Sequence, residues 1–145
     1  IQKEYLQVFE FLRMKLLNGE PIYNMDFKQK LAILRQQMVR THGCEAGRAN
    51  FLVDEQGDYY ACQNMLPYHL NIGNLEDGIC QKRQEQLKSQ FIADLKDCQQ
   101  CWARYLCGGG CQSERIFNAA SQKKYCDITR FEWAQILITI IKLNI

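Results

Sequence analysis

Little in this sequence points to nucleic acid or to a lipid bilayer. The 145 residues carry 18 Lys and Arg against 16 Asp and Glu, a net charge of only +2. Proteins that bind nucleic acid or anionic membranes usually have a much larger excess of positive charge. The longest uncharged apolar stretch, residues 133–141, is far shorter than the roughly 20 residues of a membrane-spanning helix. The first residues include Lys3, Glu4 and Glu10 instead of an apolar run, so we expect no signal peptide.

The remaining composition is that of a folded domain. Apolar residues make up 47% of the chain and charged residues 23%, close to the globular averages. A chain of this length suits one domain of ordinary size. We find no internal repeat and no low-complexity tract. The order of helical and β-prone segments predicts an α+β fold, with N-terminal helices, a small β-hairpin, and loops packed with further helices.

Helical spacing of apolar residues predicts four helices. The first contains Tyr5, Phe9 and Leu12 and stops at Asn18-Gly19. The second opens at Asp26, with Gln29 in the position of a capping box. The apolar residues of this second helix are Phe27, Leu31, Leu34 and Met38, and we expect it to end at Gly43. A third helix is marked by Leu87, Phe91 and Leu95. The last is expected over residues 127–142.

Two short β-prone runs, residues 49–53 and 58–62, flank the turn 54–57. Gly57 can adopt the positive φ that such a turn requires, so these runs predict a hairpin. A polar, Asn-rich loop is expected after the hairpin, through Pro67, Gly73 and Gly78.

Cysteine is the unusual component, with eight residues in the chain. Zinc sites usually pair two close knuckles, but the chain has one Cys-x2-Cys, and His42 and His69 are not at ligand spacing. Disulfides are possible, since eight cysteines allow 105 connectivities, although a chain with an adequate core does not need them. Iron–sulfur clusters, which use cysteine thiolates, are the third possibility.

The spacing of seven cysteines resembles a known pattern. Cys44 is followed by Gly57 and Cys62, then by Cys98-x2-Cys101-x5-Cys107-x3-Cys111, and finally by Cys126. This order is similar to that of the SPASM domain, a C-terminal extension of many radical S-adenosylmethionine enzymes. The stretch 101–111 looks like the corresponding segment of maturases that install thioether cross-links in ribosomally made peptides. Its three consecutive glycines, 108–110, predict a sharp turn and a close backbone approach.

The resemblance implies two auxiliary [4Fe–4S] clusters. Three cysteines would hold the first cluster and four would hold the second: Cys44, Cys62 and Cys111, and Cys98, Cys101, Cys107 and Cys126. Seven ligands leave one iron of the first cluster open to a substrate or to another protein group. Cys80 lies outside the pattern, and it is either a fourth ligand of the first cluster or a buried free thiol.

One motif of radical S-adenosylmethionine enzymes is absent from this sequence. S-adenosylmethionine cleavage requires a Cys-x3-Cys-x2-Cys loop, which this sequence does not contain. We therefore expect the C-terminal portion of a longer enzyme, with residues 1–41 as a helical bridge from the radical domain and 42–145 as the SPASM domain. A separate subunit that docks on a radical enzyme is the alternative. The expected partners are the radical S-adenosylmethionine domain and a precursor peptide, and the expected location is the cytoplasm.

Three other functions fit parts of the same pattern. A two-cluster electron-transfer module would use the same cysteines without contacting a substrate. A structural zinc domain would contain zinc and no sulfide, and a secreted disulfide protein would have no free thiols. We assign no catalytic side chain: His42, His69, Asp58 and Glu45 lie near predicted ligands, but a solvated surface position is the simpler interpretation for each.

Overall fold

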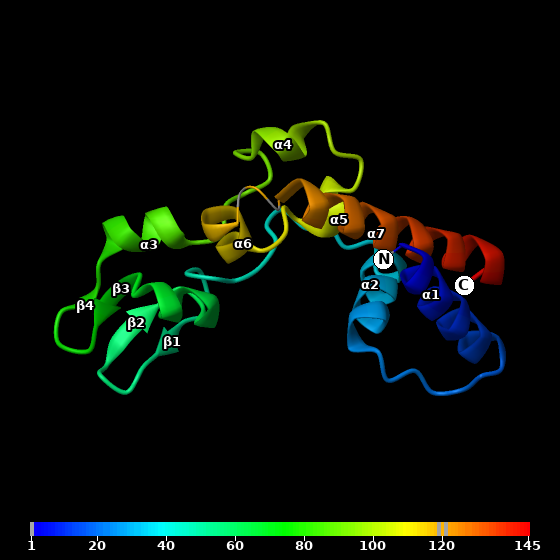
Figure 1. The fold of residues 1–145 in the computed structure, drawn as a ribbon, viewed down its shortest axis with the longest axis horizontal. Helices are drawn as coiled ribbons and strands as arrows, with labels where there is room; N and C mark the ends of the chain where they lie inside the picture. Colours follow the sequence, from blue (N-terminus) through cyan, green and yellow to red (C-terminus); the bar gives the residue numbers. More distant parts are fainter. Residues whose placement is uncertain (1, 119, 121) are drawn as a thin grey trace. The chain divides into compact units, whose positions relative to one another are not determined.

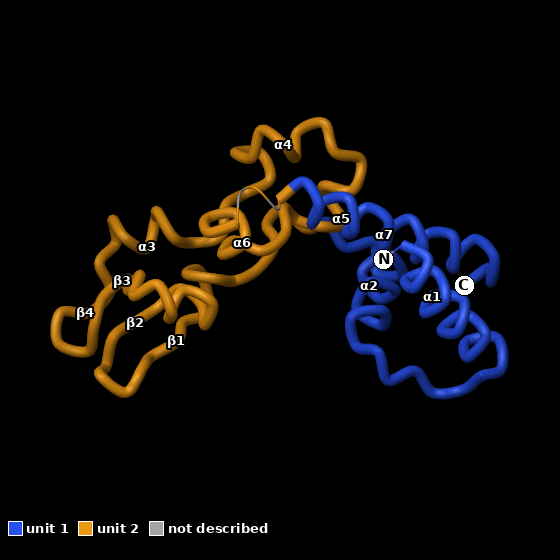
Figure 2. Tube along the Cα trace, viewed as in Figure 1, with its two compact units in different colours: residues 1–39, 123–145 blue, residues 40–122 orange. Residues whose placement is uncertain are grey.

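The computed structural model describes residues 2–118, 120 and 122–145 and has an α+β fold (Figure 1). The chain forms two compact units, coloured separately in Figure 2. Unit 1 consists of Ile1–Val39 and Lys123–Ile145, and unit 2 of Arg40–Gln122. The last helix therefore belongs with the N-terminal helices, whereas the sequence interpretation grouped it with residues 42–145.

Unit 1 contains three helices: α1 (Gln2–Leu17), α2 (Met25–Arg35) and α7 (Gln122–Leu143). The predicted first helix is confirmed, and the chain leaves it through Gly19 at φ +67°. The predicted last helix is also confirmed, with wider bounds than 127–142. The large side chains that are buried in this unit are Phe9, Leu12, Phe27, Leu31, Trp133 and Ile136.

The predicted bounds of the second helix are wrong at both ends. The N-cap is Asn24, whose side-chain oxygen accepts a hydrogen bond from the Phe27 N–H at 2.8 Å, so Asp26 lies inside the first turn. The helix ends at Arg35, and Gln37 adopts a positive φ of 52°. An apolar residue at helical spacing, Met38, had suggested a longer helix, but it is half exposed.

Polar contacts tie the helices of unit 1 together. The Arg13 guanidinium is 4% exposed and donates to Thr139 Oγ1 at 2.9 Å and to Gln135 Oε1 at 2.6 Å. Lys30 of α2 contacts Glu132 of α7 at 2.9 Å.

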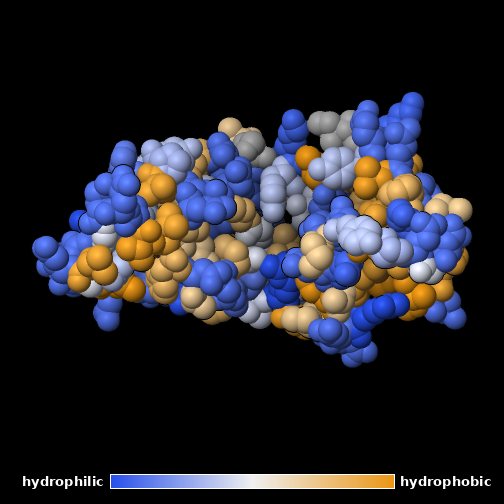
Figure 3. Space-filling view, turned by 90° about the horizontal axis from the view of Figure 1, so that it is seen from below, coloured by the Kyte–Doolittle hydropathy of each residue, from blue (hydrophilic) through white to orange (hydrophobic). Residues whose placement is uncertain are grey.

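Not every apolar residue joins the core of unit 1. The space-filling view shows hydrophobic surface on this unit (Figure 3), and α1 exposes Phe11, Met14 and Leu17.

Unit 2 contains a four-stranded antiparallel sheet in the order β1-β2-β3-β4. Its strands are β1 (Leu52–Val53), β2 (Asp58–Tyr60), β3 (Asn71–Asn74) and β4 (Gly78–Ile79). The predicted hairpin is confirmed as β1–β2, with Gly57 at φ +85°, although the strands are shorter than the predicted runs. A 3-10 helix, η1 (Gln63–Tyr68), connects β2 to β3.

The prediction of a loop after the hairpin is wrong, because β3 and β4 form there. Ile72 is fully buried, and Gly73 passes so close to β4 that an added Cβ would lie 2.0 Å from the Gly78 carbonyl oxygen. The Asn74 side chain closes the turn between these strands by accepting from the Glu76 and Asp77 N–H groups. Few apolar residues mark these short strands, so the sequence pattern did not reveal them.

The third predicted helix, marked by Leu87, Phe91 and Leu95, is also wrong. Helix α3 (Gln81–Leu87) ends where that helix was expected to be under way. The chain then pairs with an earlier segment: the Ile92 N–H donates to the Thr41 carbonyl at 2.9 Å, and His42 and Phe91 form an antiparallel bridge. This long-range pairing replaces local helical hydrogen bonds.

The described part of unit 2 also has three short helices: α4 (Lys96–Gln99), α5 (Arg104–Cys107) and α6 (Gln112–Phe117). Two small clusters of buried apolar residues lie among the described residues of this unit. The larger one is centred on Tyr60, Met65 and Ile72, and the smaller one contains Ile92, Leu95 and Cys98.

Among the residues that the structure describes, no helix has both the length and the apolar character needed to cross a membrane.

Candidate metal centre

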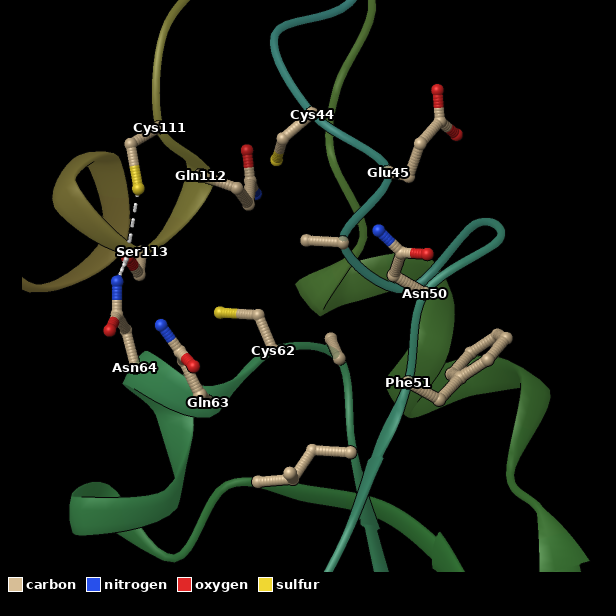
Figure 4. A pocket seen from close by; sticks show the side chains of 13 residues that line it. Cys44, Glu45, Asn50, Phe51, Cys62, Gln63, Asn64, Cys111, Gln112 and Ser113 are labelled. Atoms are coloured by element: carbon tan, nitrogen blue, oxygen red, sulfur yellow. Dashed lines mark hydrogen bonds between the residues drawn. The ribbon is translucent and has the colours of Figure 1, made fainter. Parts of the chain in front are cut away.

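Three of the predicted ligands, Cys44, Cys62 and Cys111, line one cavity of about 350 Å³ in unit 2 (Figure 4). They come from separate segments: the loop before β1, the start of η1 and the residue before α6. The described lining contains no other cysteine. The structure therefore brings together the three cysteines that the resemblance assigned to the first cluster.

Backbone contacts between glycines place Cys44 beside Cys111. A Cβ on Gly43 would lie 1.9 Å from the Gly110 carbonyl oxygen, and one on Gly108 would lie 2.3 Å from the His42 carbonyl oxygen. Side chains at these positions would keep the two segments apart. The sharp turn predicted for residues 108–110 is confirmed, since all three glycines have a positive φ.

A second backbone contact places Cys44 beside Cys62. The chain after Cys44 turns back on itself, as the Asn50 N–H donates to the Glu45 carbonyl at 3.0 Å. At this turn the Gly47 N–H donates to the carbonyl of Ala61, the residue before Cys62, at 3.0 Å. The loop that carries Cys44 is thereby attached to the end of the sheet.

Burial raises the pKa of the Cys62 thiol. The neighbouring thiols of Cys111 and Cys44 raise it further, because a thiolate is harder to form beside other sulfur charges. The backbone N–H groups of Asn64 and Met65, at the start of η1, act in the opposite direction and lower this pKa. These two N–H groups are the donors that would favour a negatively charged sulfur at this position.

Polar side chains surround Cys111. Its Sγ lies 3.0 Å from Ser113 Oγ, which also accepts a hydrogen bond from Asn64 Nδ2 at 3.2 Å (Figure 4). Helix α6 is anchored further by Phe117, whose ring stacks on Tyr68 of η1 with the centroids 3.7 Å apart. Cys111 is thus fixed between the helix that it precedes and η1.

Three cysteines of the second predicted set lie in the short helices α4 and α5 of the same unit or in the turn between them. Cys98 is in α4, and the Cys101 N–H donates to its carbonyl at 3.0 Å, so both sulfurs belong to one turn of chain. Cys107 is the last residue of α5. The fourth member, Cys126, lies on α7 in unit 1.

Cys98 has a charged neighbour. The Arg115 side chain of α6 donates from Nη2 to Cys98 Sγ at 3.2 Å and from Nε to the Gly109 carbonyl at 2.7 Å. Cys98 itself is 7% exposed.

Cys80 does not join the first set. It is exposed, precedes α3, and its backbone N–H donates to the Ile72 carbonyl at 2.7 Å. The prediction of a buried thiol is therefore wrong, because Cys80 lies at the surface end of the sheet. The alternative prediction, that Cys80 is a fourth ligand, receives no support from this position.

The candidate acids and bases lie largely at the surface. His42 Nε2 is 2.8 Å from Glu45 Oε1, and the His42 ring packs edge-on against Phe91. Glu45 points away from the three sulfurs in Figure 4. His69 is exposed, and it lines a separate acidic cavity together with the half-buried Asp58. We assign no proton transfer to these residues.

None of the eight cysteines is in a disulfide. Within the described part of the chain, no three His, Cys, Asp or Glu side chains are arranged to hold a single metal ion. A [4Fe–4S] cube needs a different arrangement, since its irons lie at separate corners and each takes one thiolate. The donor set fits a cube with one open iron, since three thiols line the cavity and Asn and Gln side chains lie in its wall.

Sequence reasoning missed Ser113 and Arg115. They follow Cys111 by two and four residues, and neither residue type nor spacing distinguishes them from ordinary surface positions. Their roles depend on how α6 folds back toward Cys111 and Cys98.

Comparison of the chain with protein-family models, with curated proteins and with solved structures finds no match.

Proposed function

We propose that this chain holds two [4Fe–4S] clusters and is the auxiliary-cluster domain of a radical S-adenosylmethionine enzyme. The enzyme modifies a ribosomally made peptide, by forming a thioether cross-link. Cys44, Cys62 and Cys111 hold the first cluster. The second is held by Cys98, Cys101, Cys107 and Cys126.

The observation that carries the proposal is the meeting of three distant cysteines at one cavity. Cys62 and Cys111 are far apart in the sequence, yet both line the cavity with Cys44. These are the three residues that the resemblance groups together, and that grouping does not follow from their order in the chain. The peptide substrate and the thioether product rest on the resemblance of residues 101–111.

Bound [4Fe–4S] clusters exchange single electrons, and an iron without a protein thiolate can accept a ligand from a substrate. The protein's own residues would orient the cluster and shield it. Ser113 and Asn64 form a polar wall beside Cys111, and the Asn64 and Met65 N–H groups face Cys62. The amide side chains of Asn50, Gln63 and Gln112 in the cavity wall could donate hydrogen bonds to a bound cluster or to its substrate.

The partners and the location follow from the same proposal. A radical-generating domain, in a longer chain or in a separate subunit, supplies S-adenosylmethionine cleavage, and the precursor peptide is the substrate. Cysteines that ligate iron must stay reduced, which places the protein in the cytoplasm.

Single cysteine substitutions test the ligand set. Protein purified without oxygen should contain about eight irons and eight sulfides. We expect Cys62→Ala to lose about four of each, and the matched control Cys80→Ala to lose none, because Cys80 lies outside the cavity. Full iron in Cys62→Ala, by elemental analysis and Mössbauer spectroscopy, would refute the ligand assignment.

A thiol probe separates the maturase from a simple electron-transfer module. Glutathione added to the reduced, loaded chain should change the electron paramagnetic resonance spectrum of one cluster, since an open iron accepts a thiolate. The Cys62→Ala protein, which lacks that cluster, should not respond. A wild-type spectrum that glutathione leaves unchanged would favour the electron-transfer module.

A further inference from the structure

Helix α6 contacts both groups of cysteines within unit 2. Ser113 lies 3.0 Å from Cys111 Sγ, in the first group. Arg115, two residues later, donates to Cys98 Sγ at 3.2 Å, in the second group. One short helix thus provides a separate polar contact to a sulfur of each group.

The position of the Arg115 guanidinium is fixed by more than its contact with sulfur. Its Nε donates to the Gly109 carbonyl at 2.7 Å. Because the guanidinium is planar and its N–H groups are held in a rigid fork, this bond determines where Nη2 points. Gly109 has φ +97°, a conformation that favours glycine. The glycine turn therefore sets the direction of the arginine.

The positive charge of Arg115 is not neutralised by an ion pair within the described part of the chain. Among the residues that the structure describes, no carboxylate lies within ion-pair distance of it. Cys98 is a buried residue, and it packs with Ile92 and Leu95. A cationic donor that faces a buried sulfur has a strong electrostatic effect, because water screens the interaction little.

We propose that Arg115 is the positioning residue for Cys98 and that it raises the reduction potential of the cluster bound there. The inference rests on the proposed function, in which Cys98 is an iron ligand. Reduction adds negative charge to a cluster, and a hydrogen bond or a cation at a ligand sulfur stabilises that charge. Ser113 has the same role, as a neutral and weaker donor, at Cys111. Helix α6 therefore tunes the two clusters through different residues.

Redox titration of the loaded full chain, followed by electron paramagnetic resonance, tests the inference. Wild-type protein should show two midpoint potentials. We expect Arg115→Gln to make one of them more negative and to leave the other unchanged. Ser113→Ala should shift the other midpoint, by a smaller amount. Arg83→Gln removes an equal charge from an exposed arginine, which pairs with Asn71 at 2.7 Å, and should shift neither.

A second measurement detects the Arg115 contact in wild-type protein and uses a variant only as its control. In wild-type protein with ¹⁵N-labelled arginine, pulsed electron paramagnetic resonance of the reduced clusters should detect a guanidinium nitrogen near one cluster. Labelled Arg115→Lys protein should lack that coupling, while its lysine restores part of the midpoint lost in Arg115→Gln.

The outcomes separate this inference from the proposed function. Wild-type protein without iron and sulfide would refute both. Two clusters with unchanged midpoints in Arg115→Gln, or with no arginine coupling in wild-type protein, would refute the role of Arg115 alone. A shift of the same midpoint by Arg115→Gln and Ser113→Ala would refute the separate tuning of the two clusters.

Discussion

The two units of this chain are built in different ways. Unit 1 has helices of 16, 11 and 22 residues, which bury large side chains such as Phe27 and Trp133. Unit 2 has strands of two to four residues, and α4 and α5 have four residues each. All the cysteines except Cys126 belong to unit 2. The cysteines are therefore concentrated where regular structure is shortest.

This difference indicates what stabilises each unit. Long helices gain stability from packing an apolar face, as Phe9 and Ile136 do in unit 1. Strands shorter than the usual five or six residues and four-residue helices gain little alone. When a metal binds to loops that lack other strong contacts, its binding free energy contributes to folding. We infer that ligation stabilises unit 2 and that side-chain packing stabilises unit 1.

The largest predicted effect is that of removing the proposed clusters, which should destabilise unit 2 and leave unit 1 nearly unchanged. Chelation of iron should increase hydrogen exchange of the amides in residues 44–50 and 98–111, because the cysteines of these loops would lose the proposed clusters. Amides of α1 and α2 should change little. Mass-spectrometric hydrogen exchange of loaded and iron-free protein measures both regions in one sample. Equal changes in the two units would contradict the contrast.

Truncation of Arg13 should have the next largest effect, confined to unit 1. Arg13→Ala removes the buried contacts to Thr139 and Gln135 and leaves a cavity. We expect a loss of about 3 kcal/mol in the free energy of unfolding, with the iron content unchanged. Arg35→Ala, at an exposed position of α2, should cost less than about 0.5 kcal/mol. Urea unfolding that found the two variants equal would show that the Arg13 contacts do not stabilise unit 1.

Lys30 offers a smaller, pH-dependent test of how side-chain contacts stabilise unit 1. Desolvation acts to lower the pKa of Lys30, but hydrogen bonds from its ammonium to Asp26 and Glu132 outweigh this, and the pKa is raised. The stability that this contact contributes is therefore fully present below the unfolded-state pKa of about 10.4 and is lost as the pH rises through the folded-state value. Lys30→Met should cost about 1 kcal/mol near pH 7. Its difference from wild type should narrow above about pH 10.4 in urea titrations, and a constant difference would contradict this account.

The sequence predicted best the elements that depend on local pattern. The apolar spacing around Phe9 and around Trp133 led to α1 and α7, and Gly57 led to the hairpin. Contacts between distant segments could not be predicted: the Ile92–Thr41 hydrogen bond and the packing of Ile72 with Tyr60 and Met65 have no local pattern. The second helix was extended too far because Met38 continues the helical spacing after the chain has turned at Gln37.

The candidate site likewise has some features that the sequence predicted and others that it could not. A resemblance in cysteine spacing grouped Cys44 with Cys62 and Cys111, and the structure places all three at one cavity. The surface position of Cys80 and the contact from Arg115 to Cys98 depend on the tertiary fold. Cysteine spacing can be compared with a known pattern, whereas the side chains that contact the sulfurs, such as Arg115, follow no such spacing.

The most direct test of the account is the amount of iron, acid-labile sulfide and zinc per chain in protein purified without oxygen. The account predicts about eight irons and about eight sulfides, with the absorbance of [4Fe–4S] clusters, because seven cysteines hold two cubes. About one or two zinc ions per chain without sulfide, under the same anaerobic handling, would contradict it and would identify unit 2 as a structural zinc domain.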